Sequence, residues 1–422
     1  MSSRTLEDMA RQVWDWCETL ATFSSDEAAL SRFYLTAEHR QANDQVAKWM
    51  QASGMSTRED AAGNLWGHYP AAPDAPTPVK RLVLGSHLDT VPNAGRYDGM
   101  LGVMLATAAV GLLNEEGIQL PFSIDVVGFG DEEGVRFGTT LLGSRAVAGT
   151  WQDDWWALQD RDGVTLAEAF KAFGLDPARI GEAALAPEDV LGYLEVHIEQ
   201  GPVLEERGLP LGIVSGIAGA RRFHVDFTGF AGHAGTVPMA MRRDAMAGAA
   251  EWLLAVEQVA RDVDVVATVG QVDCRPGGVN VIPGQARLSL DIRSGDDARR
   301  DSAVERLKAL ASEIAHRRNL SVAWQSIHSA PAVACAPWWQ NLQTEVLKTL
   351  GHEPLSVMSG AGHDAMAMAH VADCAMYFVR CEAGISHHPA EAISRDDIAP
   401  ALAALKETLL QLSGYNSASR CH

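Results

Sequence analysis

Positive charge is scarce in this sequence. Its 422 residues include 34 lysines and arginines against 54 aspartates and glutamates, a formal net charge of −20 at pH 7. Nucleic acids and anionic membranes attract proteins through basic surfaces, so this balance argues against both as partners. A small anionic substrate remains compatible with the charge, because a few local arginines can override the field of the whole molecule.

Long apolar runs and cysteine motifs are missing as well. No stretch approaches the roughly 20 uninterrupted apolar residues that span a membrane. The opening residues MSSRTLEDMARQVWDW lack the basic start and apolar core of a signal peptide. The 6 cysteines are scattered without a C-x-x-C pair, which is typical of free thiols in a reducing compartment. We therefore expect a cytoplasmic protein that binds no membrane.

The order of the apolar segments predicts an α/β domain. A length of 422 residues exceeds what one hydrophobic core usually supports, so two domains are expected. A buried strand, an apolar helix and a second buried strand follow one another over 81–87, 102–113 and 122–130, and 192–201 alternates as a strand with one polar face. This order favours a mainly parallel sheet, with functional residues at the carboxyl ends of its strands.

The middle of the chain has a different pattern. Strands are predicted over 222–229, 263–272, 286–294 and 320–327, and helices over 238–261 and 296–318. This βαββαβ order is that of a ferredoxin-like unit. The predicted fold is therefore α/β. Residues 1–212 and 330–422 form a catalytic domain with a mainly parallel sheet and helices on both faces, and residues 213–329 form an inserted ferredoxin-like α+β domain.

Acidic residues and histidines gather at the ends of the predicted strands. Two cations about 3.5–4 Å apart need a bridging oxygen and terminal nitrogen or oxygen ligands. In the DEEG segment one glutamate can ligate while its neighbour takes a proton from water, and Asp89, two positions along an extended segment, can orient the ring of His87. The candidate residues are His87, Asp89, Asp98, Glu132, Glu133, His197, His363, Asp364, His387 and His388.

Each of these pieces has an ordinary interpretation when it is taken alone. A lone histidine is more often a core or surface residue, and DEEG is usually a solvated turn. The combination, in which each member follows an apolar strand, favours a hydrolase with two metal ions. The alternatives are an enzyme with a single zinc ion, which leaves Asp98 or Glu133 idle, and a non-catalytic binding protein that keeps the fold without metals.

A set of ordered motifs gives the sequence a resemblance to a known family. The segments GSHLDTVPNAGRYDG, DEEGVRFGTTLLGSRA, HIEQGPVLE, GHAGTVPM, GGVNVIPG, DIR, SGAGHDA and GISHHPAE resemble the M20-type metallo-hydrolases, and more narrowly the branch of allantoate amidohydrolases and N-carbamoyl-L-amino-acid hydrolases. The resemblance covers nearly the whole chain. It implies two divalent ions per subunit, with Mn²⁺ or Zn²⁺ expected and Co²⁺ or Ni²⁺ compatible with the same ligands.

The resemblance also assigns roles at the metal site. It implies Glu132 as the general base and Asp89 as the carboxylate behind His87. His388 is expected to have no metal role, because the family's ligand is the histidine directly after the serine. The metal ligands are expected in two groups that share Asp98 as a bridge: His87, Asp98 and His197 on one ion, and Asp98, Glu133 and His387 on the other.

A second set of residues is expected to handle the substrate. In the inserted domain the resemblance implies His233 as a hydrogen-bond donor to the developing oxyanion, and an asparagine and an arginine as holders of the substrate carboxylate. In relatives this domain is also a lid and dimerises, so we expect a homodimer whose lid residues complete the neighbouring active site. The expected substrate-binding residues are Gln200, Arg221 or Arg222, Asn280, Arg293 and His363.

The predicted activity is the metal-dependent hydrolysis of a linear amidine or ureido C–N bond. Allantoate, which gives ureidoglycine, ammonia and carbon dioxide, is the preferred substrate because the segments FYLTAEHRQANDQVAKWM, AGNLWG and RYDGMLGV resemble allantoate amidohydrolases. N-carbamoyl-L-amino acids and β-ureidopropionate are the alternatives. A dipeptidase or aminoacylase activity is less favoured, because HIEQGP and GVNVIP fit the ureido branch better.

Overall fold

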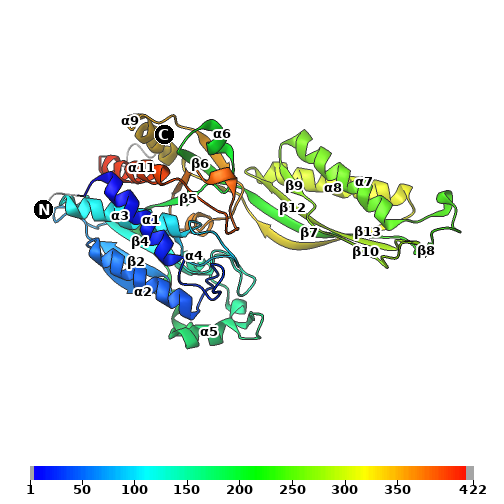
Figure 1. The fold of residues 1–422 in the computed structure, drawn as a ribbon, viewed down its shortest axis with the longest axis horizontal. Coiled ribbons are helices and arrows are strands. Elements are labelled where there is room, and N and C mark those ends of the chain that lie inside the picture. Colours follow the sequence, from blue (N-terminus) through cyan, green and yellow to red (C-terminus); the bar gives the residue numbers. More distant parts are fainter. Residues whose placement is uncertain (1–3, 415–422) are drawn as a thin grey trace. The chain divides into compact units, whose positions relative to one another are not determined.

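Figure 1 shows the computed structural model of the chain, which describes residues 4–414. The chain divides into two compact units, Met1–Ser215 with Cys335–His422, and Gly216–Ala334. The sequence prediction puts its boundaries a few residues earlier, at 212–213 and 329–330. Strand β6 (Leu211–Ile217) runs through the first boundary, and β14 (Val333–Ala334) ends at the second.

The first unit is built on a sheet whose four central strands are parallel. Within the described residues the strand order is β1-β2-β4-β3-β5-β16-β6-β14, with β15 paired to β6. Strand β3 is parallel to β4 and β5, and β5 is parallel to β16, whereas the outer strands are antiparallel to their neighbours. The expected parallel arrangement is therefore confirmed at the centre of the sheet. The other strands are β1 (Ser56–Glu59), β2 (Leu65–Tyr69), β3 (Arg81–His87), β4 (Ser123–Phe129), β5 (Val190–Ile198), β15 (Ser356–Ser359) and β16 (Cys374–Val379).

Helices lie on both faces of this sheet. Leu194 and Val196 of β5 belong to an apolar core shared with α1, α3, α9 and α11. Glu195, on the opposite face of the strand, accepts a hydrogen bond from the backbone N–H of Ala365, where α10 begins. The helices are α1 (Leu6–Leu20), α2 (Ala37–Ala52), α3 (Met100–Glu115), α4 (Leu142–Val147), α5 (Leu166–Phe173), α6 (Val203–Arg207), α9 (Pro337–Thr349), α10 (Ala365–Met368) and α11 (Arg395–Ser413).

Helix α3 is apolar on all sides, and its burial follows from that composition. Every residue from Met100 to Leu113 is buried. A helix without a polar face is stable only inside a protein, so the sequence of α3 requires cover from neighbouring elements. The helix contacts β3, β4 and β5 as well as α1 and α11. The chain segment that enters α3 is therefore held against the carboxyl ends of the central strands.

The second unit is an antiparallel sheet with two helices. Its strand order is β10-β12-β7-β13, with β9 also paired to β12, and β8 and β11 form a separate two-stranded sheet. Phe223 and Phe227 of β7 share a core with Trp252 of α7 and Leu307 of α8. The elements are β7 (Gly219–Thr228), β8 (Gly232–His233), α7 (Ala245–Val263), β9 (Val266–Thr268), β10 (Val272–Arg275), β11 (Val281–Ile282), β12 (Gln285–Ser294), α8 (Asp297–Arg317) and β13 (Ser321–Ala330).

Two predictions for this unit were wrong in their boundaries. Helix α7 begins at Ala245 rather than at 238, because the side chain of Asp244 accepts a hydrogen bond from the N–H of Ala247 and caps the helix there. The predicted strand over 263–272 does not exist as one strand. The helix continues through Val263, the chain turns at Asp264 with a φ of 55°, and two short strands follow. Core packing of Val263 overrides its β-branched preference.

Two expectations drawn from what the sequence lacks can be compared with the structure. No helix within residues 4–414 is both long and apolar enough to cross a membrane. The cysteines of the described residues are free, and Cys421 lies outside the described residues; the free ones are Cys17, Cys274, Cys335, Cys374 and Cys381. The cytoplasmic location stays a prediction.

The start of α7 can be tested by removing its cap. Asp244→Ala leaves the N–H of Ala247 without its side-chain acceptor, so we expect the free energy of unfolding to fall by about 1 kcal/mol. Met239→Ala alters the exposed turn before the helix and should change it by less than about 0.5 kcal/mol. Urea titration of both variants measures the two effects, and equal losses would contradict the assigned helix start.

Candidate metal centre

Four segments that are far apart in the sequence bring acids and histidines to one edge of the central sheet. His87 is the last residue of β3, and His197 lies at the end of β5. Glu132 and Glu133 follow β4, and His387 lies in the segment after β16. The carboxyl ends of these parallel strands meet at the same edge, as the sequence pattern predicts.

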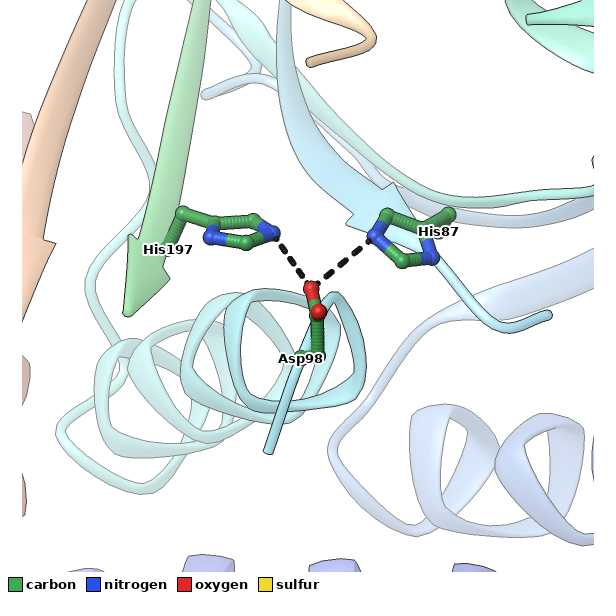
Figure 2. A group of neighbouring side chains, drawn as sticks. All are labelled: His87, Asp98 and His197. Atoms are coloured by element: carbon green, nitrogen blue, oxygen red, sulfur yellow. Dashed lines mark ion pairs between the residues drawn. The ribbon is translucent and has the colours of Figure 1, made fainter. Parts of the chain in front are cut away.

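The carboxylate of Asp98 lies at the centre of this group. Its Oδ1 is 3.1 Å from Nε2 of His197 and 3.5 Å from Nε2 of His87, and Figure 2 shows both rings directed at it. Its Oδ2 is 3.1 Å from Nε2 of His387. The two oxygens of one carboxylate thus face different histidines, which is the arrangement that a bridging ligand between two cations needs.

Within the described residues four groups of side chains bring potential ligand atoms together, and the two that share Asp98 are the ligand sets expected from the sequence. The other two groups are Glu195, His197 and His363, and His87, Glu132 and Glu133. Within each set all ligand atoms lie within 4.8 Å of one another. In the second set, Oε1 of Glu133 is 3.4 Å from Nε2 of His387 and, although buried, accepts no hydrogen bond. The sets are His87, Asp98 and His197, and Asp98, Glu133 and His387. They have the membership that the family resemblance implies, and the bare oxygen of Glu133 fits a cation.

The histidine rings are oriented by backbone carbonyls behind them. Nδ1 of His87 lies 3.0 Å from the carbonyl oxygen of Asp89, and Nδ1 of His197 lies 2.9 Å from the carbonyl oxygen of Ile198. Each Nδ1–H donates to its carbonyl, which leaves Nε2 as the nitrogen that faces Asp98. Such a bond on the far nitrogen fixes both the tautomer and the ring direction of a metal-binding histidine.

The carboxylate of Asp89 makes its hydrogen bonds to the DEEG turn and not to the ring of His87, which it was predicted to orient. Its Oδ1 is 3.6 Å from Nδ1 of His87, and the ring's hydrogen bond goes to the backbone carbonyl of the same residue. Its oxygens instead accept hydrogen bonds from the N–H groups of Glu132, at 3.0 Å, and Glu133, at 3.2 Å. Asp89 therefore holds the DEEG turn in place beside His87.

Burial and mutual repulsion perturb the titration of the whole group. Burial raises the pKa of Glu133 to about 7 and that of Glu132 well above its usual value. The hydrogen bond to Asp98 raises the pKa of His387 to about 9. Burial opposes charge on both Asp98 and His87. Hydrogen bonds with His197 and His387 nevertheless hold the pKa of Asp98 well below its usual value, and the hydrogen bond with Asp98 holds the pKa of His87 well above its usual value. Bound cations would supply the positive charge that protons on the histidines supply in this structure.

The backbone is strained at three points around the group. Asp131, Gln200 and His387 have φ values of 62°, 56° and 54°, in the left-handed region that residues other than glycine rarely adopt. Gly99 has a φ of 70°, and a Cβ there would lie 2.5 Å from the ring of His87. Strain of this kind clusters at functional sites, where the surrounding structure enforces it.

Two of the predicted substrate residues lie in this unit, beside the metal ligands. Nε2 of Gln200 donates a hydrogen bond to Oδ2 of Asp98 at 3.0 Å. His363 is fully buried, packs edge-on against His197 with ring centroids 4.5 Å apart, and has Nε2 at 2.7 Å from the hydroxyl of Ser359. Its Nδ1 is buried without a hydrogen-bond partner. Gln200 thus contacts the bridging carboxylate itself.

His233 and Asn280 come together in the second unit. The N–H of Ala234 donates to the carbonyl of Asn280, and β8 pairs with β11 alongside. Both residues are exposed. The N–H of Gly235 donates to Nδ1 of His233 at 3.0 Å, so the ring's proton is on Nε2. This tautomer presents an N–H donor, as the predicted contact with an oxyanion requires.

The arginines of the second unit are arranged differently from the prediction. Arg293 donates to both oxygens of Asp291, through Nε at 2.7 Å and Nη2 at 2.9 Å. Arg222 donates to the same carboxylate at 2.7 Å. Arg221 points to the other face of β7, where its Nη1 lies 3.4 Å from Asp301. The structure therefore brings Arg222, and not Arg221, beside Arg293.

Sequence reasoning missed two buried glutamates of the first unit. Glu195 accepts hydrogen bonds from Ser86 and Tyr193, and Glu391 accepts them from the segment that carries Asp98. Glu195 stands in the alternating polar row of its strand, and Glu391 ends the motif GISHHPAE. Both positions were visible as acids within motifs, but nothing in their spacing reveals which partner each one meets.

His388 is exposed, and its Nδ1 accepts the N–H of Ala390.

Comparisons with known proteins give this geometry a family context. Residues 83–411 match the model of the peptidase family M20/M25/M40. An N-carbamoyl-L-amino acid amidohydrolase of Geobacillus stearothermophilus is 42% identical over 386 residues, covering 91% of this chain and 93% of that protein. An allantoate deiminase of Arabidopsis thaliana is 38% identical over 418 residues, covering 91% and 79%. The crystal structure of an amidase of the hydantoinase/carbamoylase family from Burkholderia multivorans superposes with a TM-score of 0.89 at 30% identity, covering 96% and 98%.

The titration of the group predicts that divalent ions displace protons. At pH 7 the raised pKa of His387, about 9, keeps its ring protonated, and a ring must lose that proton to bind a metal. We therefore expect Mn²⁺ binding to the chelator-treated chain to release protons and to tighten as the pH rises from 7 towards 9. Calorimetry in buffers of different ionisation enthalpy measures the release. A binding enthalpy that is the same in all buffers would contradict it.

Proposed function

This chain belongs to the peptidase family M20/M25/M40, and from that membership we propose that it is a two-metal hydrolase of ureido acids with allantoate as its first candidate substrate. It is an amidohydrolase that acts on C–N bonds other than peptide bonds, in the branch of the allantoate deiminases and N-carbamoyl-L-amino acid amidohydrolases. The observation that carries the proposal is the carboxylate of Asp98, which is shared between two sets of ligand atoms.

The residues of the first unit divide into holders of cations and a proton carrier. When bound, two divalent ions polarise a carbonyl group and lower the pKa of water. Glu132 belongs to neither of the two ligand sets that share Asp98. An oxygen of its carboxylate lies within 4.8 Å of ligand atoms of His87 and Glu133. Its raised pKa suits a group that takes a proton from water and delivers it to the leaving nitrogen.

The second unit supplies groups that recognise the substrate. The Nε2–H of His233 is a donor for the oxyanion that develops on the ureido carbon, and the exposed amide of Asn280 lies on the adjoining segment. Arg293, with Arg222 beside it, offers guanidinium groups for the substrate carboxylate, in exchange for part of the pairing with Asp291. As the family resemblance implies, the proposed enzyme is a homodimer in which these residues complete the site of the neighbouring subunit.

Gln200 and His363 have roles within the first unit. The amide of Gln200 has one N–H on Asp98, so its carbonyl oxygen is the group left to accept from a substrate amide. The bare Nδ1 of His363 is a second polar atom for the substrate. The ligands are nitrogen and oxygen atoms, which suit Mn²⁺ or Zn²⁺ and also tolerate Co²⁺ or Ni²⁺.

A second candidate activity is the hydrolysis of N-carbamoyl-L-amino acids. The similarity to the Geobacillus protein supports it, because that identity, 42%, is higher than the 38% with the allantoate deiminase of Arabidopsis thaliana. Both substrate classes carry a ureido group and a carboxylate, so the same metal ligands and the same arginine serve either. The two substrate classes differ in the group on the carbon next to the carboxylate, which is a second ureido group in allantoate and an amino-acid side chain in the N-carbamoyl-L-amino acids.

A parallel assay of ammonia release discriminates between these substrates. The chain, loaded with Mn²⁺, is given allantoate, a set of N-carbamoyl-L-amino acids and 3-ureidopropionate. We expect the largest kcat/KM with allantoate. A larger value with a carbamoyl amino acid would shift the assignment to the second candidate, and no release from any of the three would overturn the ureido proposal.

The role of Glu132 is tested by an isosteric change. Glu132→Gln cannot take a proton from water, so turnover should fall by about 100- to 10,000-fold. The bound metal should stay at the level of the unchanged chain, because Glu132 is not a member of either ligand set. The exposed Glu188→Gln is the matched control and should keep full activity. A Glu132→Gln enzyme with normal turnover would refute the assignment of the base.

A further inference from the structure

Glu391 is a buried carboxylate that contacts no member of the metal site through a side-chain ion pair, yet is bonded to the segments that carry two of them. It is 3% exposed. Its Oε1 accepts the backbone N–H groups of Tyr97, at 2.9 Å, and Asp98, at 3.1 Å. Its Oε2 accepts the hydroxyl of Ser386 at 2.9 Å. One carboxylate therefore joins the backbone of Asp98 to the residue that precedes His387.

The joined segments are distant in the sequence. Glu391 and Asp98 are 293 residues apart. Asp98 lies just before the first turn of α3, whereas His387 lies in a turn after β16 and has a left-handed backbone conformation. Backbone hydrogen bonds close this turn on itself, from Glu391 to His388 and from Glu382 to Ala392. Its hydrogen bonds to the segment of Asp98 are made by side chains. The bond of Glu391 to the Ser386 hydroxyl fixes the residue next to the ligand.

The side chain of Glu391 packs tightly against the backbone at Gly95, in the segment that leads to Asp98. A Cβ at residue 95 would lie 2.1 Å from the carboxyl carbon of Glu391, so any larger residue at Gly95 requires the side chain of Glu391 to move. The hydroxyl oxygen of Ser386 also lies 3.1 Å from Oδ2 of Asp98 and accepts from the amide of Gln200 at 3.1 Å. The network thus runs from Glu391 through Ser386 to the oxygen of Asp98 that faces His387.

We propose that Glu391 is a positioning residue that sets the distance between the bridging carboxylate of Asp98 and His387, and thereby the affinity of the second metal ion. The inference rests on the proposed function, because it requires that two ions bind. Glu391 is not itself a ligand, since its oxygens are taken up by two backbone N–H groups and a hydroxyl. Its effect on the first ion is smaller than on the second, because two of the three ligands of the first ion, His87 and His197, are held by β3, β5 and their own backbone carbonyls.

The experiment measures metal content rather than activity. Glu391→Ala removes all three hydrogen bonds, and Gly95→Ala displaces the same carboxylate from the opposite segment. Glu391→Gln keeps a carbonyl oxygen for the two N–H groups but reverses the bond to Ser386. Each chain is stripped with a chelator, refilled with Mn²⁺, separated by gel filtration, and analysed for ions per chain and for affinity by chelator competition.

The matched control is a buried carboxylate outside the site. Asp397 is 2% exposed and accepts two hydrogen bonds from Arg380, at 3.0 Å and 2.7 Å. Asp397→Asn therefore weakens a comparable buried interaction. Its partner Arg380 begins the segment that carries His387, but this ion pair includes none of the five expected metal ligands. The melting temperature of every chelator-treated variant shows how far each change affects the fold in the absence of metal.

The expected result is a selective defect. Glu391→Ala and Gly95→Ala should weaken one of the two ions by about 10- to 100-fold, the range for changes behind a metal ligand. Glu391→Gln should weaken it less, and Asp397→Asn should keep both ions. Two ions with unchanged affinity in Glu391→Ala would overturn this inference alone, and so would an equal loss of both ions. A single ion in the unchanged chain would overturn the two-metal proposal and this inference together.

Discussion

The structure of the first unit depends on keeping one buried carboxylate, that of Asp98, between three histidines. Its two oxygens lie 3.1 Å from His197 and His387 on opposite sides, and His87 is 3.5 Å away. A buried anion without counter-charge is costly, so the surroundings must supply positive charge, as protons on the rings or as cations. This requirement explains why the histidines converge here from two strands, β3 and β5, and the turn after β16.

Some of the candidate metal ligands are positioned by the strands of the sheet, and the others by turns. The parallel strands place His87 and His197 at one edge, and the buried helix α3 presses the segment of Asp98 against it. The remaining groups lie on irregular backbone, where Asp89 fixes the DEEG turn and Glu391 and Ser386 connect the last turn to Asp98. Left-handed residues at Asp131, Gln200 and His387 are tolerated because these bonds over-determine the turns.

The second unit contributes chemistry of another kind. It offers an imidazole N–H donor at His233 and a guanidinium pair, Arg222 and Arg293, held by Asp291. None of these side chains is a metal ligand in the groups of the first unit. In the proposed enzyme, activation of water belongs to the first unit and recognition of the substrate to the second.

The sequence by itself determined the periodicities, and so the order of elements and the set of candidate ligands. Strand β3 was predicted at its observed bounds, and the five expected ligands do converge, because alternation and strand-end motifs are local properties. Tertiary structure decided the rest. The end of α7 at Val263 depends on core packing, and the position of Arg222 rather than Arg221 beside Arg293 depends on which face of β7 meets Asp291. The contacts of Asp89, Gln200 and Glu391 join residues up to 294 positions apart. Such contacts leave no trace in spacing, because they are set by how the chain packs and not by neighbours along it.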